Sequence, residues 1–334
     1  MRPMMALACF AHLVACGGAQ LASDADGMLW VEDCVAHIFY SQAQSPETRV
    51  ASGTGFVVDA QRGVLVTAAH VVSEGDLVDV RFSGFSGHDS AHVPAVIVTV
   101  DAQRDVALLR LDPAEGLEAV GLAQVSPRIG TPLVVFGFPE SNVVGDEMRR
   151  TTAVVSSLRA NPLDPDDDLT RMIELEAKIE PGNSGSPVFD ERKRVVGVVS
   201  SRWETTDSFA LASPVEVVRD LLSDRYDADL ERLVSTLKED PKEITSEATA
   251  IHDLARGLSL EFPVGGEGRQ RALGLTQAMK EVLFEAVECQ RALRQMRIAE
   301  ASRRLHRMRH ILDLNKSDIR ALKSVRRSLS LDGN

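Results

Sequence analysis

The sequence of 334 residues predicts a β-rich first region followed by a smaller all-α region. The chain is longer than a typical single domain, so two domains are expected. Up to about residue 215, short runs rich in Val, Ile and Thr recur between turn residues, at intervals of roughly ten residues. This spacing is typical of a β-barrel or a β-sandwich, because no long helical segment intervenes to connect parallel strands. Beyond Pro214, apolar residues recur at helical spacing instead.

Each expected element is a run bounded by turn or breaking residues. Strands are expected at residues 31–40, 55–58, 64–67, 77–82, 93–100, 106–111, 133–137, 152–158, 172–175, 187–190 and 194–200. Helices are expected at residues 215–222, 251–258, 273–289, 290–312 and 316–329. Pro241 and the stretch 262–266 are expected to interrupt the helical region, and residues 315–318 to break and cap it before the last helix. The Arg-rich end is therefore expected to form a helical hairpin or a small bundle.

Charge is unevenly distributed along the chain. The net charge of −12 argues against a protein that binds nucleic acid as a whole. From Arg291 to the end there are 12 Lys and Arg but 4 Asp and Glu, so this end carries +8 and the preceding 290 residues carry −20. The split predicts two halves that attract one another or have different partners. For the basic end, three alternatives remain: packing on the acidic region, binding to an anionic membrane surface, and self-association or binding of a partner protein.

The N-terminus begins with Met1-Arg2, followed by an apolar run at residues 4–14 that is too short to span a membrane as a helix. The run ends in LVACGG and resembles a bacterial lipoprotein signal. This resemblance implies that residues 1–28 are a signal and tether, and that Cys16 carries a lipid. The protein is then expected to be exported to the bacterial cell envelope and anchored there, facing the periplasm. A plain secretion signal and a buried first element are the alternatives.

The other cysteines outside the apolar run, Cys34 and Cys289, are far apart in sequence. We expect two buried free thiols, with a disulfide as the alternative in an oxidising compartment. No later segment has 18 uninterrupted apolar residues, so no second membrane span is expected.

The stretch IEPGNSGSPVFD at residues 179–190 places Ser184 between glycines. A serine nucleophile needs a base to take its proton and donors to hold the oxyanion. His70 lies in GVLVTAAHVV at residues 63–72, at the end of an expected strand, and Asp105 directly precedes the expected strand VALLRL. The order His, Asp, Ser is one of three common arrangements of the serine triad. The oxyanion hole is expected at residues 182–184, with the backbone amides of Gly182 and Ser184 as donors and Asn183 between them.

Several blocks, in this order and spacing, resemble the trypsin-like serine proteases, and most of all their HtrA/Deg branch. They are SGTGFVVDAQRGVLVTAAHVV, DVALLRL, PLVVFGFPES, TTAVVSSL, IEPGNSGSPVFD, VVGVVSSRW and FALASPVEVVRDLL. The resemblance covers roughly residues 30–225. It implies an all-β double six-stranded barrel at residues 29–225. The helical spacing beyond it predicts a smaller all-α domain at residues 226–334. The resemblance also assigns the triad to His70, Asp105 and Ser184.

The resemblance implies a serine endopeptidase that hydrolyses peptide bonds in cell-envelope proteins. The alternative is a catalytically silent protease fold that serves as a binding scaffold through its helical domain. Two departures from the family pattern stand out: Asn183 precedes Ser184 where animal digestive relatives have Asp, and Ser186 replaces the usual Gly. Without that Asp, activation by a new N-terminus is not expected. No PDZ-like pattern follows residue 225.

Lys178, six residues before Ser184, lies where the family places the base of the substrate pocket. With Ser200, Ser201 and Arg202 it is expected to line that pocket, with a preference for acidic or small apolar side chains.

No metal and no cofactor is expected. His88 and His92 lack a third ligand, and the acidic run 164–168 lacks the glycine and terminal Glu of a calcium loop.

Overall fold

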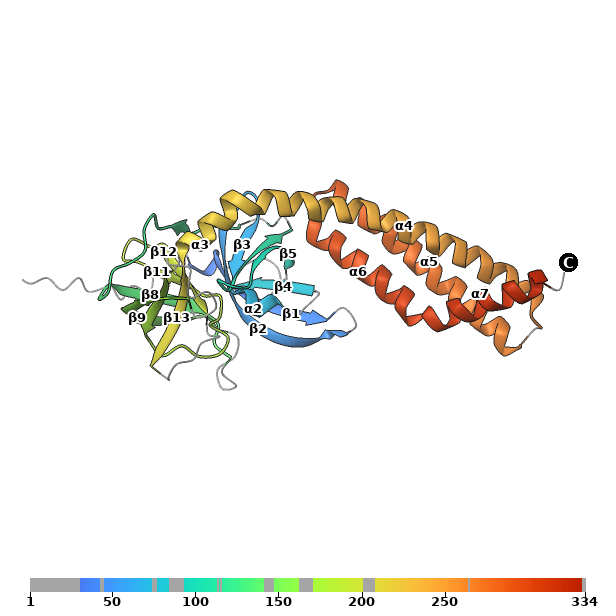
Figure 1. The fold of residues 1–334 in the computed structure, drawn as a ribbon, viewed down its shortest axis with the longest axis horizontal. Helices are drawn as coiled ribbons and strands as arrows, with labels where there is room; N and C mark the ends of the chain where they lie inside the picture. The colour runs from blue at the N-terminus through green and yellow to red at the C-terminus, as the bar shows by residue number, and fades with distance from the viewer. Residues whose placement is uncertain are drawn as a thin grey trace, which may run out of the picture.

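The computed structural model describes residues 31–42, 45–73, 77–83, 93–112, 114, 116–140, 147–161, 171–200, 208–263 and 265–331. Two β-barrels lie side by side at one end, and long helices extend from them to the other end (Figure 1). None of the helices in these ranges combines the length and apolarity that crossing a membrane requires.

The first barrel is a closed ring of antiparallel strands in the order β1-β2-β3-β6-β5-β4. Its strands are β1 (Val35–Gln42), β2 (Ser45–Asp59), β3 (Val64–Thr67), β4 (Leu77–Phe82), β5 (Val93–Asp101) and β6 (Val106–Leu111), with the short helix α2 (Ala69–Val72) after β3. The ring closes around buried aliphatic side chains such as Ile38, Leu65 and Leu109. Burial of these side chains is the main stabilising contribution in such a core.

The second barrel has the strand order β11-β8-β9-β10-β13-β12 and closes through the β11–β12 pairing. Its strands are β8 (Pro132–Gly137), β9 (Arg149–Arg159), β10 (Met172–Glu176), β11 (Pro187–Phe189), β12 (Arg194–Ser200) and β13 (Phe209–Pro214), and the short β7 (Gly121–Leu122) pairs in parallel with β12. The predicted double six-stranded barrel is therefore confirmed. A third apolar cluster, which includes Phe56, Phe138 and Tyr226, lies between the barrels and the first helices.

The helical region begins with α3 (Val215–Asp220), which passes through a π-helical turn (Leu221–Arg225) into α4 (Tyr226–Glu261) without a break. The domain boundary expected between residues 225 and 226 thus falls within a continuous helical run. α5 (Glu267–Arg294) folds back along α4, and α6 (Ile298–Leu314) and α7 (Lys316–Leu331) complete a small helical bundle (Figure 1).

Two expectations about the helices are wrong. The break expected between residues 289 and 290 lies at residues 295–297, where Met296 adopts a positive φ of 58°. Pro241 does not interrupt the helical region but lies buried inside α4. A proline there removes one backbone hydrogen bond, but the apolar face of a 36-residue helix keeps its packing on both sides of it.

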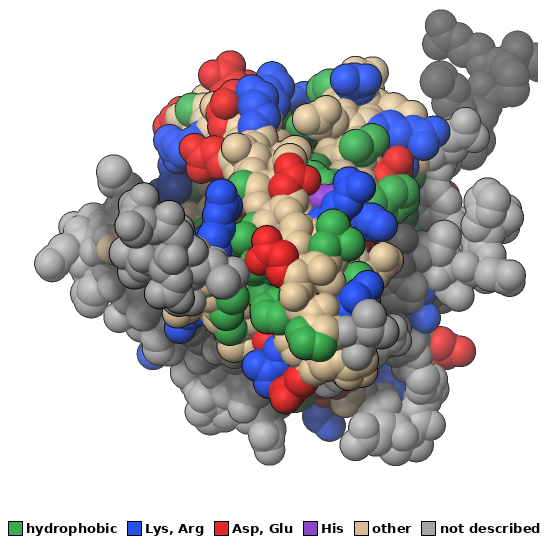
Figure 2. Space-filling model, turned by 90° about the vertical axis from the view of Figure 1, so that its right-hand side faces the viewer, with side chains coloured by type: hydrophobic (Ala, Val, Ile, Leu, Met, Phe, Trp, Pro, Cys, Tyr) green, Lys and Arg blue, Asp and Glu red, His purple; other side chains and the backbone are tan. Residues whose placement is uncertain are grey.

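Four arginines of α6 in the basic end pair with acidic side chains. Arg304 pairs with Glu285 and Glu300, Arg307 pairs with Glu281 and Glu285, Arg309 pairs with Asp240, and Arg303 pairs with Asp79 of the first barrel. The far end of the bundle, seen in Figure 2, shows acidic and basic side chains intermixed around exposed hydrophobic ones. The basic segment thus pairs with the rest of the chain, as expected if it packs on the acidic region.

Cys34 and Cys289 are both buried and are not joined by a disulfide. Burial raises the pKa of the Cys34 thiol to about 12 and that of Cys289 to about 11. Both thiols are therefore protonated at neutral pH and are poor nucleophiles.

Candidate active site

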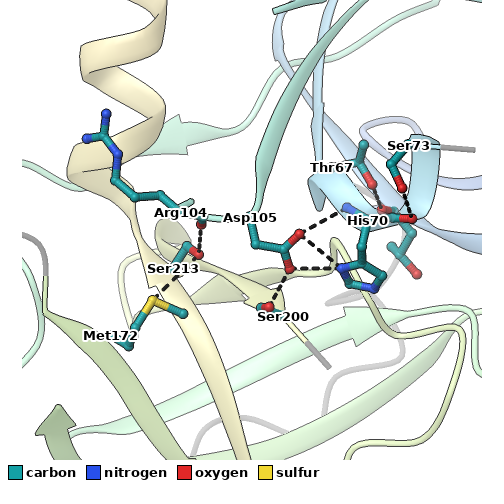
Figure 3. Close-up of polar contacts among 9 residues, drawn as sticks. Thr67, His70, Ser73, Arg104, Asp105, Met172, Ser200 and Ser213 are labelled. Carbon is teal, nitrogen blue, oxygen red and sulfur yellow. Dashed lines mark hydrogen bonds and ion pairs between the residues drawn. The ribbon is translucent and has the colours of Figure 1, made fainter. Parts of the chain in front are cut away.

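His70 lies in α2, directly after the fully buried strand β3. Its ring Nδ1 is 2.8 Å from Oδ2 and 3.0 Å from Oδ1 of Asp105, and its backbone N–H donates to the same Oδ1 at 3.0 Å (Figure 3). The carboxylate therefore holds both the ring and the backbone of His70. The side chain of His70 is 24% exposed and that of Asp105 is 2% exposed, so the imidazole keeps an accessible edge while its partner is buried.

Asp105 ends a tight turn before β6 and has a positive φ of 53°. Asp is one of the few non-glycine residues that tolerate this left-handed conformation. Asp101 closes the turn by accepting from the backbone N–H of Arg104 at 3.0 Å and from its Nε at 2.8 Å. The hydroxyl of Ser200, from β12, donates to Asp105 Oδ2 (Figure 3). The carboxylate is thus held by donors from both barrels.

Ser184 lies in the turn of residues 182–186 that precedes β11, called here the serine turn. Thr54 of β2 connects the first barrel to this turn. Its backbone N–H donates to the Ser184 carbonyl at 2.8 Å, and its hydroxyl donates to the Gly182 carbonyl at 2.9 Å while accepting from Phe138 N at 3.0 Å. Thr67 in turn donates its hydroxyl to the Thr54 carbonyl at 2.7 Å. Thr54 is fully buried, so the serine turn is held from the barrel that carries His70.

The two glycines of the serine turn are required by both conformation and space. Gly182 and Gly185 have φ of +90° and +84°. A Cβ on Gly182 would lie 2.4 Å from the Phe138 carbonyl, and one on Gly185 would lie 2.1 Å from the Thr54 carbonyl and 2.3 Å from Thr67 Oγ1. A side chain at Gly185 would push the turn away from the first barrel, and one at Gly182 would push it away from the segment that follows β8.

The serine turn also lies close to the helix that carries His70. A Cβ on Gly53 would meet both the side chain of Val71, at 2.7 Å, and the carbonyl of Ser184, at 3.1 Å. Gly53 therefore lies in space between the Ser184 backbone and Val71, the residue that follows His70. The fold thus brings His70 and Asp105 into direct contact and places the serine turn close to the helix that carries His70.

A family model described as a trypsin-like peptidase domain matches residues 53–198. Residues 53–198 are a trypsin-like peptidase domain. This match agrees with the class of domain predicted from the sequence.

Among curated relatives, a probable periplasmic serine endoprotease, DegP-like, of Ectopseudomonas mendocina is 30% identical over 217 residues, which are 64% of this chain and 42% of that protein. An uncharacterized protein of Sinorhizobium fredii, y4bJ, is 35% identical over 177 residues, which are 52% of this chain and 26% of that protein. This chain therefore spans less than half the length of these two relatives. A solved serine endoprotease of Yersinia pestis shares 17% identity with a TM-score of 0.48, over 60% of this chain and 66% of that one. The DegP-like relatives agree with the predicted HtrA/Deg branch.

In the trypsin-like domain, one of the three residues expected at the oxyanion hole has its amide committed elsewhere. The Asn183 N–H donates to the Glu180 carbonyl at 3.1 Å, and its side-chain Nδ2 donates to the same carbonyl at 3.2 Å. Asn183 therefore folds back within its own segment. The proposed donors to an oxyanion are the amides of Gly182 and Ser184.

Ser186, which departs from the family pattern, is fully buried. Its hydroxyl has no hydrogen-bond partner in the part of the chain that the structure describes. A Cβ on Gly137 would lie 2.1 Å from this hydroxyl, so the extra atoms at position 186 fit because position 137 has no side chain.

The residues expected to line the substrate pocket have different surroundings. Lys178 is exposed after β10. Ser200 is fully buried and bonds Asp105, so its observed contact is with the candidate triad. Ser201 and Arg202 lie outside the described residues, as do Cys16, the two histidines 88 and 92, and the acidic run 164–168. Within the described ranges, no group of three or more His, Cys, Asp or Glu side chains is arranged to hold a metal ion.

Sequence reasoning did not identify the supporting roles of Thr54, Thr67 and Ser200. These small polar residues stand inside apolar strand-like blocks, in SGTGF, LVTAAH and VVSS. A buried hydroxyl in such a block needs a partner, and that requirement is the signal that could have marked them. The partner itself is not visible from the sequence.

Proposed function

We propose that this protein is a serine endopeptidase that cleaves peptide bonds by acyl transfer through Ser184, His70 and Asp105. Ser184 attacks the scissile carbonyl, and His70 accepts its proton and later donates it to the leaving amine. Asp105 holds the imidazole in the tautomer that accepts this proton and stabilises its positive form. The amides of Gly182 and Ser184 stabilise the oxyanion.

The observation that carries this proposal is the pair of contacts that the Asp105 carboxylate makes with His70. One carboxylate bonds both the ring Nδ1 and the backbone N–H of His70, and Ser200 supports it from the other barrel. With Nδ1 bonded to the carboxylate, Nε2 is left as the proton acceptor. Contacts with the ring and the backbone of His70, together with the hydroxyl of Ser200, are expected where the imidazole has to be oriented for catalysis.

The test is covalent labelling with a fluorophosphonate, which reacts with activated serines, followed by intact-mass measurement and peptide mapping. The wild type is expected to gain one adduct on Ser184. Ser184→Ala is expected to remove the adduct, and His70→Ala to slow labelling by at least about a thousandfold, because the base is lost. Ser246→Ala, at an exposed serine in the middle of α4, is the matched control and is expected to label as the wild type does. A folded wild type without an adduct would reject the enzyme and favour the scaffold alternative.

For the location, we propose export and lipid anchoring through Cys16 in the cell envelope, where envelope proteins would be the substrates. The N-terminal pattern of residues 1–18 supports this, and the relative from Ectopseudomonas mendocina is named as periplasmic. Metabolic labelling with an alkyne fatty acid should mark the wild type and not Cys16→Ser. An unlabelled wild type that is released to the soluble fraction would contradict the anchor.

For the substrate, we propose a preference for acidic or small apolar side chains at the cleaved position. The exposed ammonium of Lys178, six residues before Ser184, supports the acidic preference. Cleavage of a peptide library should show it, and Lys178→Glu should weaken it relative to wild type. A preference for Arg or Lys would reject it.

A further inference from the structure

The first turns of the helical region hold the β5–β6 hairpin that carries Asp105. Thr99 on β5, which is almost fully buried, donates its hydroxyl to Asp229 Oδ2 of α4 at 3.0 Å. The next residue, Val100, accepts from the guanidinium of Arg225 at 3.3 Å. Thr99 and Val100 directly precede Asp101, whose carboxylate closes the turn before Asp105. The near end of the hairpin is thus fixed to the start of α4.

The turn itself is also tied to the helices. Arg104, which precedes Asp105, pairs with Asp220 of α3 at 3.7 Å while its Nε bonds Asp101. Its carbonyl accepts from the hydroxyl of Ser213, at the end of β13 (Figure 3). Because α3 continues without a break into α4, Asp220, which pairs with Arg104, and Asp229, which binds Thr99, belong to one continuous helical run.

The far end of the hairpin is fixed to α6. Asp112 follows β6 directly and is 4% exposed. Its two carboxylate oxygens accept from the backbone N–H groups of Ala299 at 2.9 Å and Glu300 at 3.0 Å, in the first turn of α6. Beside it, Arg303 of α6 donates to the carbonyl of Val78 at 2.9 Å and to Asp79 at 2.6 Å, on the neighbouring strand β4.

An apolar contact joins these two attachments. Val96, in the middle of β5, packs against a buried cluster formed by all of the first three long helices. The cluster consists of Leu237, Cys289, Ala292, Ile298, Ala301 and Leu305. Helices α4 and α6 therefore contact the hairpin along its length, from the residues before the Asp105 turn to the residue after β6.

A left-handed non-glycine residue such as Asp105 is kept in place only when its surroundings over-determine it. Here part of the surroundings is the helical region, which lies outside the trypsin-like match at residues 53–198. We propose that the C-terminal helices are a positioning element for Asp105: through Thr99–Asp229 at one end of the β5–β6 hairpin and Asp112–α6 at the other, they hold the turn that orients His70.

This inference rests on the proposed function, since it assigns a role in orienting the base. Its test uses the full chain with Thr99→Val, an isosteric change that removes the hydroxyl, and with Asp112→Ala and Asp112→Asn. Glu281→Gln is the matched control, because it breaks the Glu281–Arg307 pair between α5 and α6 and touches no barrel residue. Each variant is first checked for wild-type secondary structure by circular dichroism.

Thr99→Val is expected to lower kcat for peptide cleavage, and the rate of fluorophosphonate labelling, by about tenfold with little change in KM, since small misplacements of a catalytic group lower the rate at this scale. Asp112→Ala, which acts from the far end, is expected to have a smaller effect in the same direction. Asp112→Asn keeps one acceptor oxygen and should recover part of the loss. Glu281→Gln should keep the wild-type rates.

The proton NMR resonance of the His70 Nδ1–H, assigned through loss of the signal in His70→Ala, gives a readout that does not depend on activity. Thr99→Val should shift or broaden it, and Glu281→Gln should leave it unchanged. Folded Thr99→Val and Asp112→Ala proteins with wild-type rates and an unchanged resonance would overturn the inference, as would an equal loss in Glu281→Gln. If the wild type itself does not label, the proposed function fails, and the resonance alone decides the positioning role.

Discussion

The serine turn of the barrels and the α5–α6 pair of the helical region are held by different kinds of contact. In the serine turn, Thr54 bonds the carbonyls of Gly182 and Ser184, and two glycines make the close approach possible. Between α5 and α6, the buried carboxylate of Glu285 is held by the guanidinium groups of Arg304 and Arg307.

The two kinds of contact predict different tolerance to substitution in the two regions. The close backbone contacts leave no room for one added carbon. A single substitution at either glycine should therefore displace the whole serine turn. Charged side chains with several partners can lose one and keep another, so the helices should weaken in steps.

Gly185→Ala should have the largest effect. The new Cβ would lie 2.1 Å from the Thr54 carbonyl at a φ of +84°, so the turn has to move. We expect a loss of more than about 4 kcal/mol in the free energy of unfolding, measured by urea denaturation, together with loss of the Ser184 adduct. Gly130→Ala is the matched control: its φ is +83° and nothing lies within 4 Å, so it should cost about 1 kcal/mol of conformational strain. Equal costs for both would show that backbone conformation, and not close packing, limits the serine turn.

Arg304→Ala should come next. Glu285 is 2% exposed and would keep only Arg307, at 3.2 Å, as a charged partner. Leaving a buried carboxylate partly unpaired should cost about 3 kcal/mol in the free energy of unfolding. Arg309 lies on α6, as Arg304 does, and forms a more exposed pair with Asp240 of α4. Arg309→Ala should therefore lower the free energy of unfolding by less than about 1 kcal/mol. A loss as large in Arg309→Ala would mean that surface pairs, too, hold the bundle.

Ser186→Ala should stabilise the protein by about 1 kcal/mol, because it keeps the Cβ and removes a buried hydroxyl that has no partner among the described residues. Urea denaturation measures the gain. The labelling rate of Ser184 should not fall. A loss of stability would show that the Ser186 hydroxyl makes a hydrogen bond in solution, and that the serine turn depends on its side chain.

Asp112 should give the smallest effect, a change in how stability depends on pH. Burial raises the pKa of its carboxyl, although the amides of Ala299 and Glu300 and the charge of Arg297 act the other way. The folded state then binds a proton more tightly than the unfolded state, so the contribution of Asp112 to stability is fully present below the unfolded pKa and is lost as the pH rises through the folded pKa.

The stability difference between wild type and Asp112→Asn should therefore favour the wild type more at low pH than at neutral pH. Denaturation at a series of pH values measures it. A difference that grows with rising pH would show that the two helix amides outweigh burial at Asp112.

The parts of the candidate site that were predictable are those with local signals. His70, Asp105 and Ser184 each end or interrupt an apolar run, and their order along the chain suggested a triad. The strands were predictable because alternation and turn residues act over a few positions. The long α4 was harder, because the proline signal at Pro241 is local while the packing that overrides it is not.

The contacts that support the site could not be predicted, because each joins residues far apart in the chain. Ser200 and Asp105 are 95 residues apart, Thr54 and Gly182 are 128 apart, and Asp112 and Ala299 are 187 apart. Ser200 illustrates the consequence: its place near the family's pocket region suggested a pocket residue, but barrel closure turns its hydroxyl toward Asp105.

By itself, the sequence determined the class of fold, the chemical groups of the site and the opposite charge of the two regions. These properties are carried by residue type and short-range periodicity. Only the tertiary structure decided which hydroxyl supports Asp105, which carbonyls Thr54 binds, and that the helices hold the β5–β6 hairpin at both ends. The physical reason is that hydrogen bonds and close packing depend on distances of a few ångströms, which barrel closure and helix docking set for residues that are distant in sequence.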